Sequence, residues 1–202
     1  MNVRLYMNML TVATTLALPG LAFGQGKSAV SGGKAEAEEI VDTVVDRLWE
    51  LTDVHWHKGE YNHIVNLCKM VVAADPSQVD AFGNAGWLLW SMNRDAEAIA
   101  VYEAGLKANP NSFYMYDELG FYYYNRKKNY PAAIKYLERA SQFPDSRMNT
   151  LHTLAHAYEK SGNLESCAKT WERAAKDPGD AAARTNLARV RKKMRGQQDK
   201  PN

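Results

Sequence analysis

Apolar residues recur along the chain in three similar blocks: Asn-Ala-Gly-Trp-Leu-Leu at 84–89, Glu-Leu-Gly-Phe-Tyr-Tyr at 118–123 and Thr-Leu-Ala-His-Ala-Tyr at 153–158. In each block a small residue precedes a large one by three positions, as Gly86 precedes Leu89. A turn rich in Asn, Gly or Lys follows each block, and then an alanine-containing segment, at 96–106, 131–140 and 164–175. The pattern predicts pairs of helices, because the small residue lets two backbones approach and the large one fills the gap a turn later.

Prolines divide the chain with a fixed period. They stand at Pro76, Pro110, Pro144 and Pro178, each 34 residues after the last. Proline ends a helix because it supplies no N–H and disfavours helix in the residue before it. Each unit is then a helical hairpin that cannot bury its own apolar face and must stack on the next. The unit that ends at Pro144 has one extra residue in its turn and one fewer before its proline.

With these small, aromatic, alanine and proline positions, the unit resembles the tetratricopeptide repeat. The resemblance is good over 79–179. An earlier block, 45–76, matches more loosely, since Thr52 stands in place of the small residue and Ile64 in place of the alanine. The resemblance implies an all-α solenoid of about four tetratricopeptide-repeat hairpins over residues 36–179.

The first residues have the features of a signal peptide. Arg4 gives a positive start, 9–18 is an apolar run as long as a signal-peptide core, and small residues precede a cleavage site after Gly24. A spanning helix needs about 20 apolar residues, which this run does not reach. We therefore expect residues 1–24 to be removed and the protein to be exported, periplasmic or secreted. An uncleaved N-terminal anchor that tethers the chain to a membrane is the alternative.

The sequence also predicts segments that flank the repeats. A flexible linker rich in Gly and Ser is expected at 25–35, with the first helix beginning near Glu36. After the last repeat, 180–195 is expected to form a capping helix, because a narrow apolar stripe faces the repeat and the rest is polar. Residues 196–202 are expected to form a polar tail. The stripe consists of Ala183, Leu187 and Val190.

The geometry of the family, carried over by resemblance, places the first helix of each hairpin along a concave surface. Residues one and two turns apart on one helical face point into it. The register gives Trp49, Asp53 and Trp56 from the first unit, Gly83, Trp87 and Trp90 from the second, Asp117, Phe121 and Tyr124 from the third, and His152, His156 and Glu159 from the fourth. On the same register Leu89, Tyr123 and Tyr158 are expected in the packed core, and Tyr122 near the contact between units.

The aromatic residues of this surface favour a binding function. An exposed apolar patch usually marks an interaction site, and Trp and Tyr are favoured anchors there, although packing in the core is the alternative for each single ring. The family's best-known groove uses Lys and Asn to clamp a C-terminal carboxylate. Here Trp, Phe, Asp and His occupy those columns, so that binding mode does not carry over.

We therefore expect a non-enzymatic adaptor whose groove binds a partner protein segment, apolar or aromatic, with a basic residue attracted by Asp53, Asp117 and Glu159. The alternatives are a small ligand, either a glycan stacked on the tryptophans or a metal ion, and self-association through the same aromatic surface. The oligomeric state is left open.

A metal site is a weaker hypothesis. His152 and His156 are four residues apart on one helical face with Glu159 three further on, and such a set could bind Zn²⁺ or Cu²⁺. Solvated side chains are the simpler interpretation, because only three ligands are visible. His55 and His57 are weaker still, since they face different sides of a helix. No cofactor is expected.

Composition and motifs exclude other classes. The 202 residues are 46% hydrophobic and 24% charged with a net charge of +2, as in a globular protein without an obligatory anionic partner. Nucleic acid is not expected, because the predicted groove holds acids. The chain has no Gly-rich phosphate loop, Gly-x-Ser-x-Gly, His-Glu-x-x-His or CxxC motif, so no enzymatic activity is expected.

Two further features concern the surface and the thiols. The capping helix is basic, and a weak contact with an anionic membrane or acidic partner is possible through Arg189, Arg191, Lys192, Lys193 and Arg195, although charge runs are usually solvated. Cys68 and Cys167 are expected to be small buried groups far apart rather than a disulfide.

Overall fold

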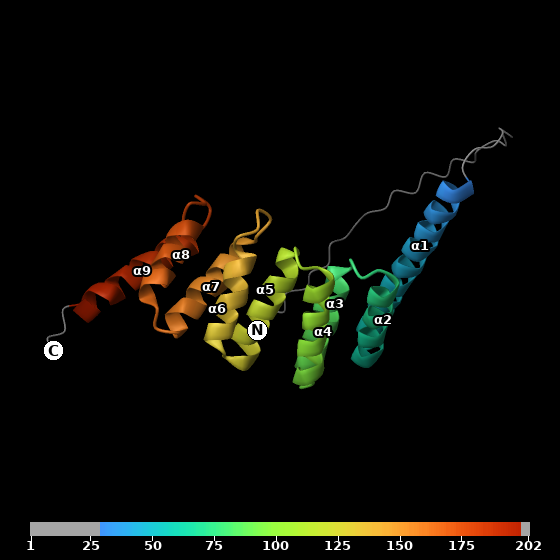
Figure 1. Cartoon of the computed structure of the whole chain (residues 1–202). Helices are drawn as coiled ribbons and strands as arrows, with labels where there is room; N and C mark the ends of the chain where they lie inside the picture. The colour runs from blue at the N-terminus through green and yellow to red at the C-terminus, as the bar shows by residue number, and fades with distance from the viewer. Residues whose placement is uncertain (1–28, 199–202) are drawn as a thin grey trace.

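The computed structural model describes residues 29–198, and its regular elements over that range are all helices. The helices pair into hairpins that stand side by side in one row (Figure 1). A last helix, α9 (Ala181–Gln198), packs against α8. The prediction of an all-α helical repeat is confirmed. The hairpins are α1 (Ala29–His57) with α2 (Tyr61–Ala74), α3 (Val79–Ser91) with α4 (Asp95–Ala108), α5 (Phe113–Tyr122) with α6 (Tyr130–Ala140), and α7 (Met148–Lys160) with α8 (Leu164–Ala174).

The boundaries at the two ends differ from the sequence expectation. The expected signal peptide, 1–24, lies outside the described residues, as do 25–28. The expected linker is wrong beyond that point, because α1 begins at Ala29 rather than near Glu36. Two glycines cost this helix about 1 kcal/mol each relative to alanine, but the strong helix formers of 34–39 follow directly. At the other end α9 continues to Gln198, past the predicted end at 195.

The turns inside the hairpins share one backbone conformation. Each contains a residue with positive φ, namely Gly59 (71°), Asn93 (63°), Lys128 (52°) and Gly162 (85°). In three of the hairpins the following N–H donates to the carbonyl five residues earlier, as Glu60 does to His55 at 3.0 Å. This bond satisfies a carbonyl that the end of the helix leaves without a partner. The turn therefore fixes where the second helix of each hairpin starts.

The third hairpin accommodates its extra residue as a π-helical turn, η1 (Tyr123–Lys127). There the N–H of Asn129 donates to the carbonyl of Tyr123, six residues earlier, at 3.0 Å. Burial of the aromatic residues in this hairpin differs from the sequence expectation. Tyr122 is 0% exposed beside the preceding hairpin, whereas Tyr123, expected in the core, is only partly buried and stacks on Tyr136 with ring centroids 5.6 Å apart.

Close contact within the second and third hairpins depends on the glycines that the sequence pattern singles out. A Cβ atom on Gly86 would lie 2.4 Å from the ring of Tyr102, and one on Gly120 would lie 2.5 Å from Cγ of Leu137. Tyr102 on α4 and Leu137 on α6 are both completely buried. Glycine is therefore required at these crossings, because any side chain would force the helices apart.

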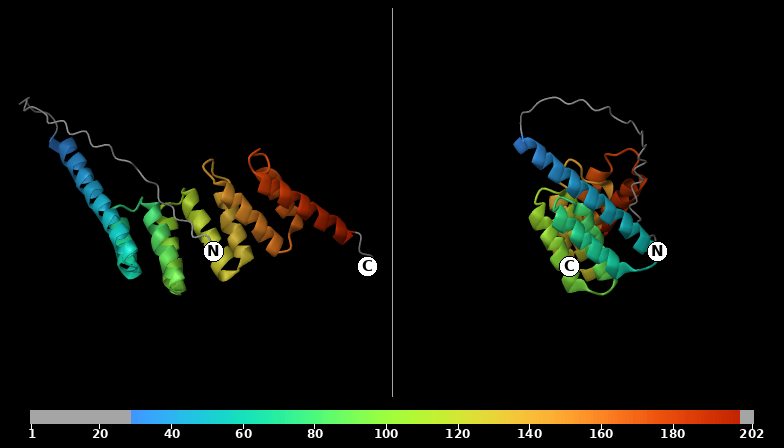
Figure 2. Two further views of the ribbon diagram at one scale, coloured as in Figure 1. Left: turned by 180° about the vertical axis from the view of Figure 1, so that it is seen from behind. Right: turned by 90° about the vertical axis from the view of Figure 1, so that its right-hand side faces the viewer.

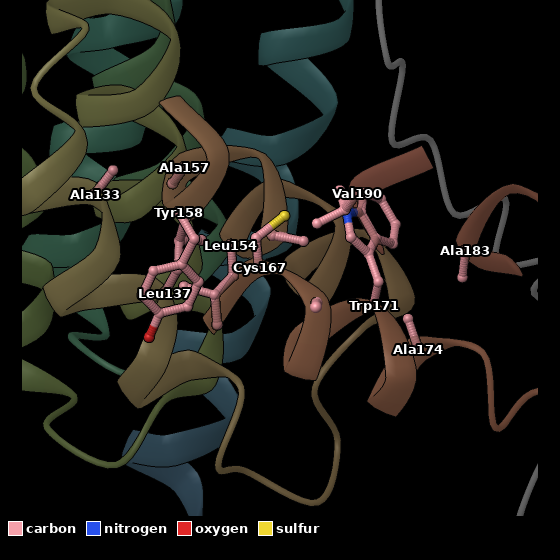
Figure 3. Packing of buried hydrophobic residues seen from close by; sticks show 12 residues of the cluster. Ala133, Leu137, Leu154, Ala157, Tyr158, Cys167, Trp171, Ala174, Ala183 and Val190 are labelled. Atoms are coloured by element: carbon pink, nitrogen blue, oxygen red, sulfur yellow. The ribbon is translucent and has the colours of Figure 1, made fainter. Parts of the chain in front are cut away.

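Helix α9 closes the end of the row. Its Ala183 and Val190 are 0% exposed, and Figure 3 shows Val190 beside Trp171 of α8. Leu187 is partly buried against the same cluster, so the predicted apolar stripe does face the last repeat. Both cysteines are buried and free, as expected. None of the helices within 29–198 combines the length and apolarity needed to cross a membrane.

We expect Gly86→Ala to lower the stability of the chain by about 1–3 kcal/mol, because the new methyl group overpacks against a buried ring. Gly196→Ala is the matched control, since a Cβ atom there meets nothing within 4 Å and alanine favours helix by about 1 kcal/mol. Thermal unfolding followed by circular dichroism measures both. Equal melting temperatures for the two variants would contradict the close crossing.

Candidate functional site

Three tryptophans form one continuous surface, which we call the tryptophan strip: Trp56 on α1 and Trp87 and Trp90 on α3. The ring centroids of Trp56 and Trp87 are 6.2 Å apart, and those of Trp87 and Trp90 are also 6.2 Å apart. All three residues are partly exposed. The strip therefore joins two hairpins through side chains that are neither fully buried nor free in solvent.

Packing and one hydrogen bond hold the strip in place. The three rings rest on the core cluster that includes Leu88 and Leu89. The indole Nε1 of Trp90 donates to the Tyr102 hydroxyl at 3.3 Å, and that hydroxyl donates to Oε2 of Glu118 at 3.5 Å. Because the rings are fixed before any ligand arrives, little side-chain entropy is lost when they are covered.

The other predicted aromatics do not join the strip. Trp49 is partly buried and packs against the same core cluster. Tyr124 lies against Tyr130, with ring centroids 5.8 Å apart. Phe121 is partly exposed, and no ring contact between Phe121 and the strip occurs within 29–198. The structure thus brings together part of the expected aromatic surface and leaves Trp49, Phe121 and Tyr124 outside the strip.

Gly83 does not line an open groove. It is buried beneath Tyr114, since a Cβ atom on Gly83 would lie 2.4 Å from the Tyr114 hydroxyl oxygen. An apolar cleft of about 370 Å³ lies instead on another face of α3, between α2 and α4, and Ala81 and Ala85 contribute to it. At 100° per residue, those alanines point away from Trp87 and Trp90.

The fourth hairpin offers a ligand neither an unpaired carboxylate at Glu159 nor a metal site. Oε1 and Oε2 of Glu159 accept hydrogen bonds from Arg189 at 2.6 and 2.7 Å, and these bonds lower the pKa of Glu159 to about 2. Nε2 of His152 lies 2.5 Å from Oδ2 of Asp180. The rings of His152 and His156 pack on Trp171, with centroids 5.0 and 5.1 Å away. The structure does not support the weaker metal hypothesis, because the donor atoms of Glu159 and His152 already have partners in the chain.

The basic face of α9 is largely paired within the chain. Besides Arg189, Lys193 Nζ lies 3.4 Å from Glu159, and Arg191 donates to Glu172 at 2.6 Å. The weak contact with an anionic membrane or acidic partner is not supported, since Arg189, Arg191 and Lys193 already have carboxylate partners. The sequence of the helix alone could not show these ion pairs, because the acids belong to the preceding hairpin and lie outside 181–198.

Acidic side chains lie on the helices that carry or follow the strip. Asp53 is exposed, 3.7 Å from Nδ1 of His57. Asp117 accepts a hydrogen bond from the Thr150 hydroxyl at 2.8 Å. Glu118, which sequence reasoning missed, is partly buried. Its burial, followed by the negative charge of Asp117, raises the pKa of Glu118 to about 8. Its place beside Asp117 in the repeated block was the only available signal.

Comparison with known proteins identifies the repeat. Two tetratricopeptide-repeat family models match the chain, at residues 79–112 and 148–190. The chain contains tetratricopeptide repeats in these two ranges. Comparison with curated proteins by sequence gave no match.

Solved structures of tetratricopeptide-repeat proteins share the fold. PilF of Pseudomonas aeruginosa is 17% identical with a TM-score of 0.64, covering 77% of this chain and 71% of its own. MamA of Desulfovibrio magneticus RS-1 is 17% identical with a TM-score of 0.60, covering 75% and 85%. YrrB, described as a TPR protein with an unusual peptide-binding site, is 17% identical with a TM-score of 0.58, covering 83% and 84%.

At these identities the likeness concerns the fold alone. Proteins of this family generally serve as scaffolds for protein–protein interaction and are generally not enzymes. That general role is consistent with the partly exposed rings of the strip. It does not identify the ligand.

The raised pKa of Glu118 predicts a pH dependence of stability. The ordinary value is 4.5, so between about pH 4.5 and 8 the folded chain retains a proton that the unfolded chain releases. Stability therefore falls as the pH rises across this window, by at most about 1.4 kcal/mol per pH unit. We expect the melting temperature of Glu118→Gln to equal that of wild type at pH 5 and to lie a few °C above it at pH 8.

The measurement is thermal unfolding between pH 5 and 8, with the exposed Glu103→Gln as the control. The negative charges of Asp117 and Asp80 raise the pKa of Glu118. The positive charge of Arg147 and the hydrogen bond from Tyr102 lower that pKa. Parallel pH profiles for wild type and Glu118→Gln would contradict a buried, largely neutral carboxyl at this position.

Proposed function

We propose that this protein is a non-enzymatic adaptor that binds a segment of a partner protein on the tryptophan strip. The observation that carries the proposal is the ring-to-ring contact of Trp56, Trp87 and Trp90 across two hairpins. Contiguous exposed rings of this kind are the usual anchors of protein interfaces. The general role of tetratricopeptide-repeat proteins as interaction scaffolds supports the same function.

The partner segment would be apolar or aromatic, with a basic residue nearby. Trp49, Phe121 and Tyr124 are partly exposed outside the strip, and a longer segment would use them to extend the apolar contact. Asp53 and Asp117, with the neighbouring Asp80, supply negative charge on the same first helices. Charge complementarity at the edge of an apolar anchor fixes the orientation of the ligand more than its affinity. We leave out His152, His156 and Glu159, because their neighbours within the chain already engage them.

Binding on the strip would need no chemical step, only contact between the partner segment and the preformed rings. The stacked hairpins hold the rings rigidly, and the hydrogen bond from Trp90 to Tyr102 fixes one indole. A segment that covers the strip removes the exposed parts of three tryptophans from water, which contributes about 25 cal/mol per Å² of apolar surface. We further propose that residues 1–24 direct export, so that the partner would be met outside the cytoplasm.

The experiment is capture of partners from an extract of the producing cells, followed by affinity measurement with the purified partner. We expect Trp87→Ala to weaken binding about 30-fold or more, the loss typical of an aromatic anchor worth 2 kcal/mol. Met70→Ala is the matched control, since Met70 is apolar and 55% exposed but lies on α2, outside the strip. We expect its affinity to stay within about twofold of wild type.

Equal affinities for wild type and a folded Trp87→Ala would show that the strip is not the binding site. Capture of a second copy of this chain alone, with concentration-dependent sedimentation, would replace the adaptor by self-association. Binding of an oligosaccharide and of no protein would point to the glycan alternative.

A further inference from the structure

Three metal-ligating side chains converge where the first hairpin turns. His55 lies in the last turn of α1, Glu60 directly precedes α2, and His63 lies in the first turn of α2. One donor atom from each lies within 4.8 Å of the other two. Nδ1 of His55 is 2.6 Å from Oε2 of Glu60, and Nδ1 of His63 is 3.8 Å from the same oxygen. The two imidazole rings are nearly perpendicular, with centroids 4.9 Å apart.

The backbone holds these donors on a defined frame. Gly59 has a φ of 71°, which closes the turn after α1. The N–H of Glu60 donates to the carbonyl of His55 at 3.0 Å, and the N–H of His63 donates to the carbonyl of Glu60 at 2.9 Å. Each of the three residues is thus bonded through its backbone to another of the three. Donors fixed in this way lose little entropy on binding an ion.

We propose that His55, Glu60 and His63 bind a divalent transition-metal ion of the Zn²⁺ type. Two imidazole nitrogens and one carboxylate oxygen form a donor set that suits Zn²⁺, whereas Mg²⁺ and Ca²⁺ prefer oxygen alone. Three protein ligands leave one position of a tetrahedral ion for water. The side chains are 24%, 41% and 60% exposed for His55, Glu60 and His63, so an ion reaches them directly from solvent.

Two of the three donor separations are close to those that an ion needs. Bonds of about 2.0–2.2 Å in tetrahedral geometry place donor atoms roughly 3.3 Å apart. The separation of 2.6 Å between His55 and Glu60 has to widen, and that of 3.8 Å between Glu60 and His63 has to narrow. Both changes are well under 1 Å, which exposed side chains accommodate by small rotations. The ion replaces the hydrogen that His55 and Glu60 now share.

Such an ion would tie the end of α1 to the start of α2. Figure 2 shows this hairpin at one end of the row, where α1 extends well beyond its partner helix. Trp56 follows His55 directly and contacts Tyr61, with ring centroids 5.6 Å apart. The positive charge of Lys58 acts on Glu60 and weakens the attraction for a cation. His57 is turned away, with its Nδ1 2.9 Å from the Asp53 carbonyl oxygen, and takes no part.

The test is the melting temperature and Zn²⁺ affinity of the full-length chain, purified without a histidine tag. At a free Zn²⁺ concentration about 100 times the dissociation constant, we expect the melting temperature to rise by about 5 °C or more. Mg²⁺ at the same concentration leaves it unchanged. We expect His63→Ala to weaken Zn²⁺ binding at least tenfold and Glu60→Gln to do the same.

His57→Ala is the matched control, because it removes a neighbouring histidine that lies outside the cluster. We expect its Zn²⁺ affinity to stay within twofold of wild type. Circular dichroism without metal shows whether every variant is folded. Sedimentation shows whether the Zn²⁺ complex contains one chain or two. No Zn²⁺-dependent shift, an equal loss in His57→Ala, or Zn²⁺-driven pairing of two chains would each overturn the proposed intrachain site.

Discussion

The second and third hairpins each depend on a glycine that lets a large side chain of the second helix press against the backbone of the first. Tyr102 occupies the space over Gly86, and Leu137 occupies the space over Gly120. Because protein interiors are packed without spare volume, this contact fixes both the distance and the rotation of the paired helices. Rotation decides which residues of a first helix face the core and which face outward. The partly exposed positions of Trp87 and Trp90 on α3 follow from that rotation, as does the contact of Trp87 with Trp56 on the preceding hairpin.

The same crossing couples the strip to a partly buried acid, Glu118. Tyr102, which packs on Gly86, also accepts the indole hydrogen bond of Trp90 and donates to Glu118 on the next hairpin. One side chain therefore links packing within the second hairpin, the orientation of the strip and the protonation of Glu118. Negative charge from Asp80 and Asp117 acts on the same carboxyl. Changes in the ionisation of Glu118 would act on the surface that we propose to bind a partner.

The repeated small, large and proline positions were sufficient to predict the hairpins, since those positions determine how two helices cross and where the second one ends. Side chains at the ends of the row were harder to predict. Glu159 and His152 looked open because the register treats each first helix alone, but Arg189 and Asp180 come from beyond the last repeat. His63 and Glu60 were missed because their partnership with His55 runs across a turn rather than along one helical face. In the third hairpin Tyr122 rather than Tyr123 is fully buried. The sequence does not indicate that the inserted residue of its turn forms a π-helical turn rather than a longer loop.

The most direct measurement of the central claim is photo-crosslinking from the strip in living cells. A benzophenone-bearing amino acid at position 87 keeps an aromatic group in place of Trp87, and the same group at position 70 serves as the control on α2. After irradiation, adducts are identified by mass spectrometry. We predict a discrete adduct with another protein from position 87 and none from position 70. No adduct from position 87, or the same adducts from both positions, would contradict a partner-binding tryptophan strip.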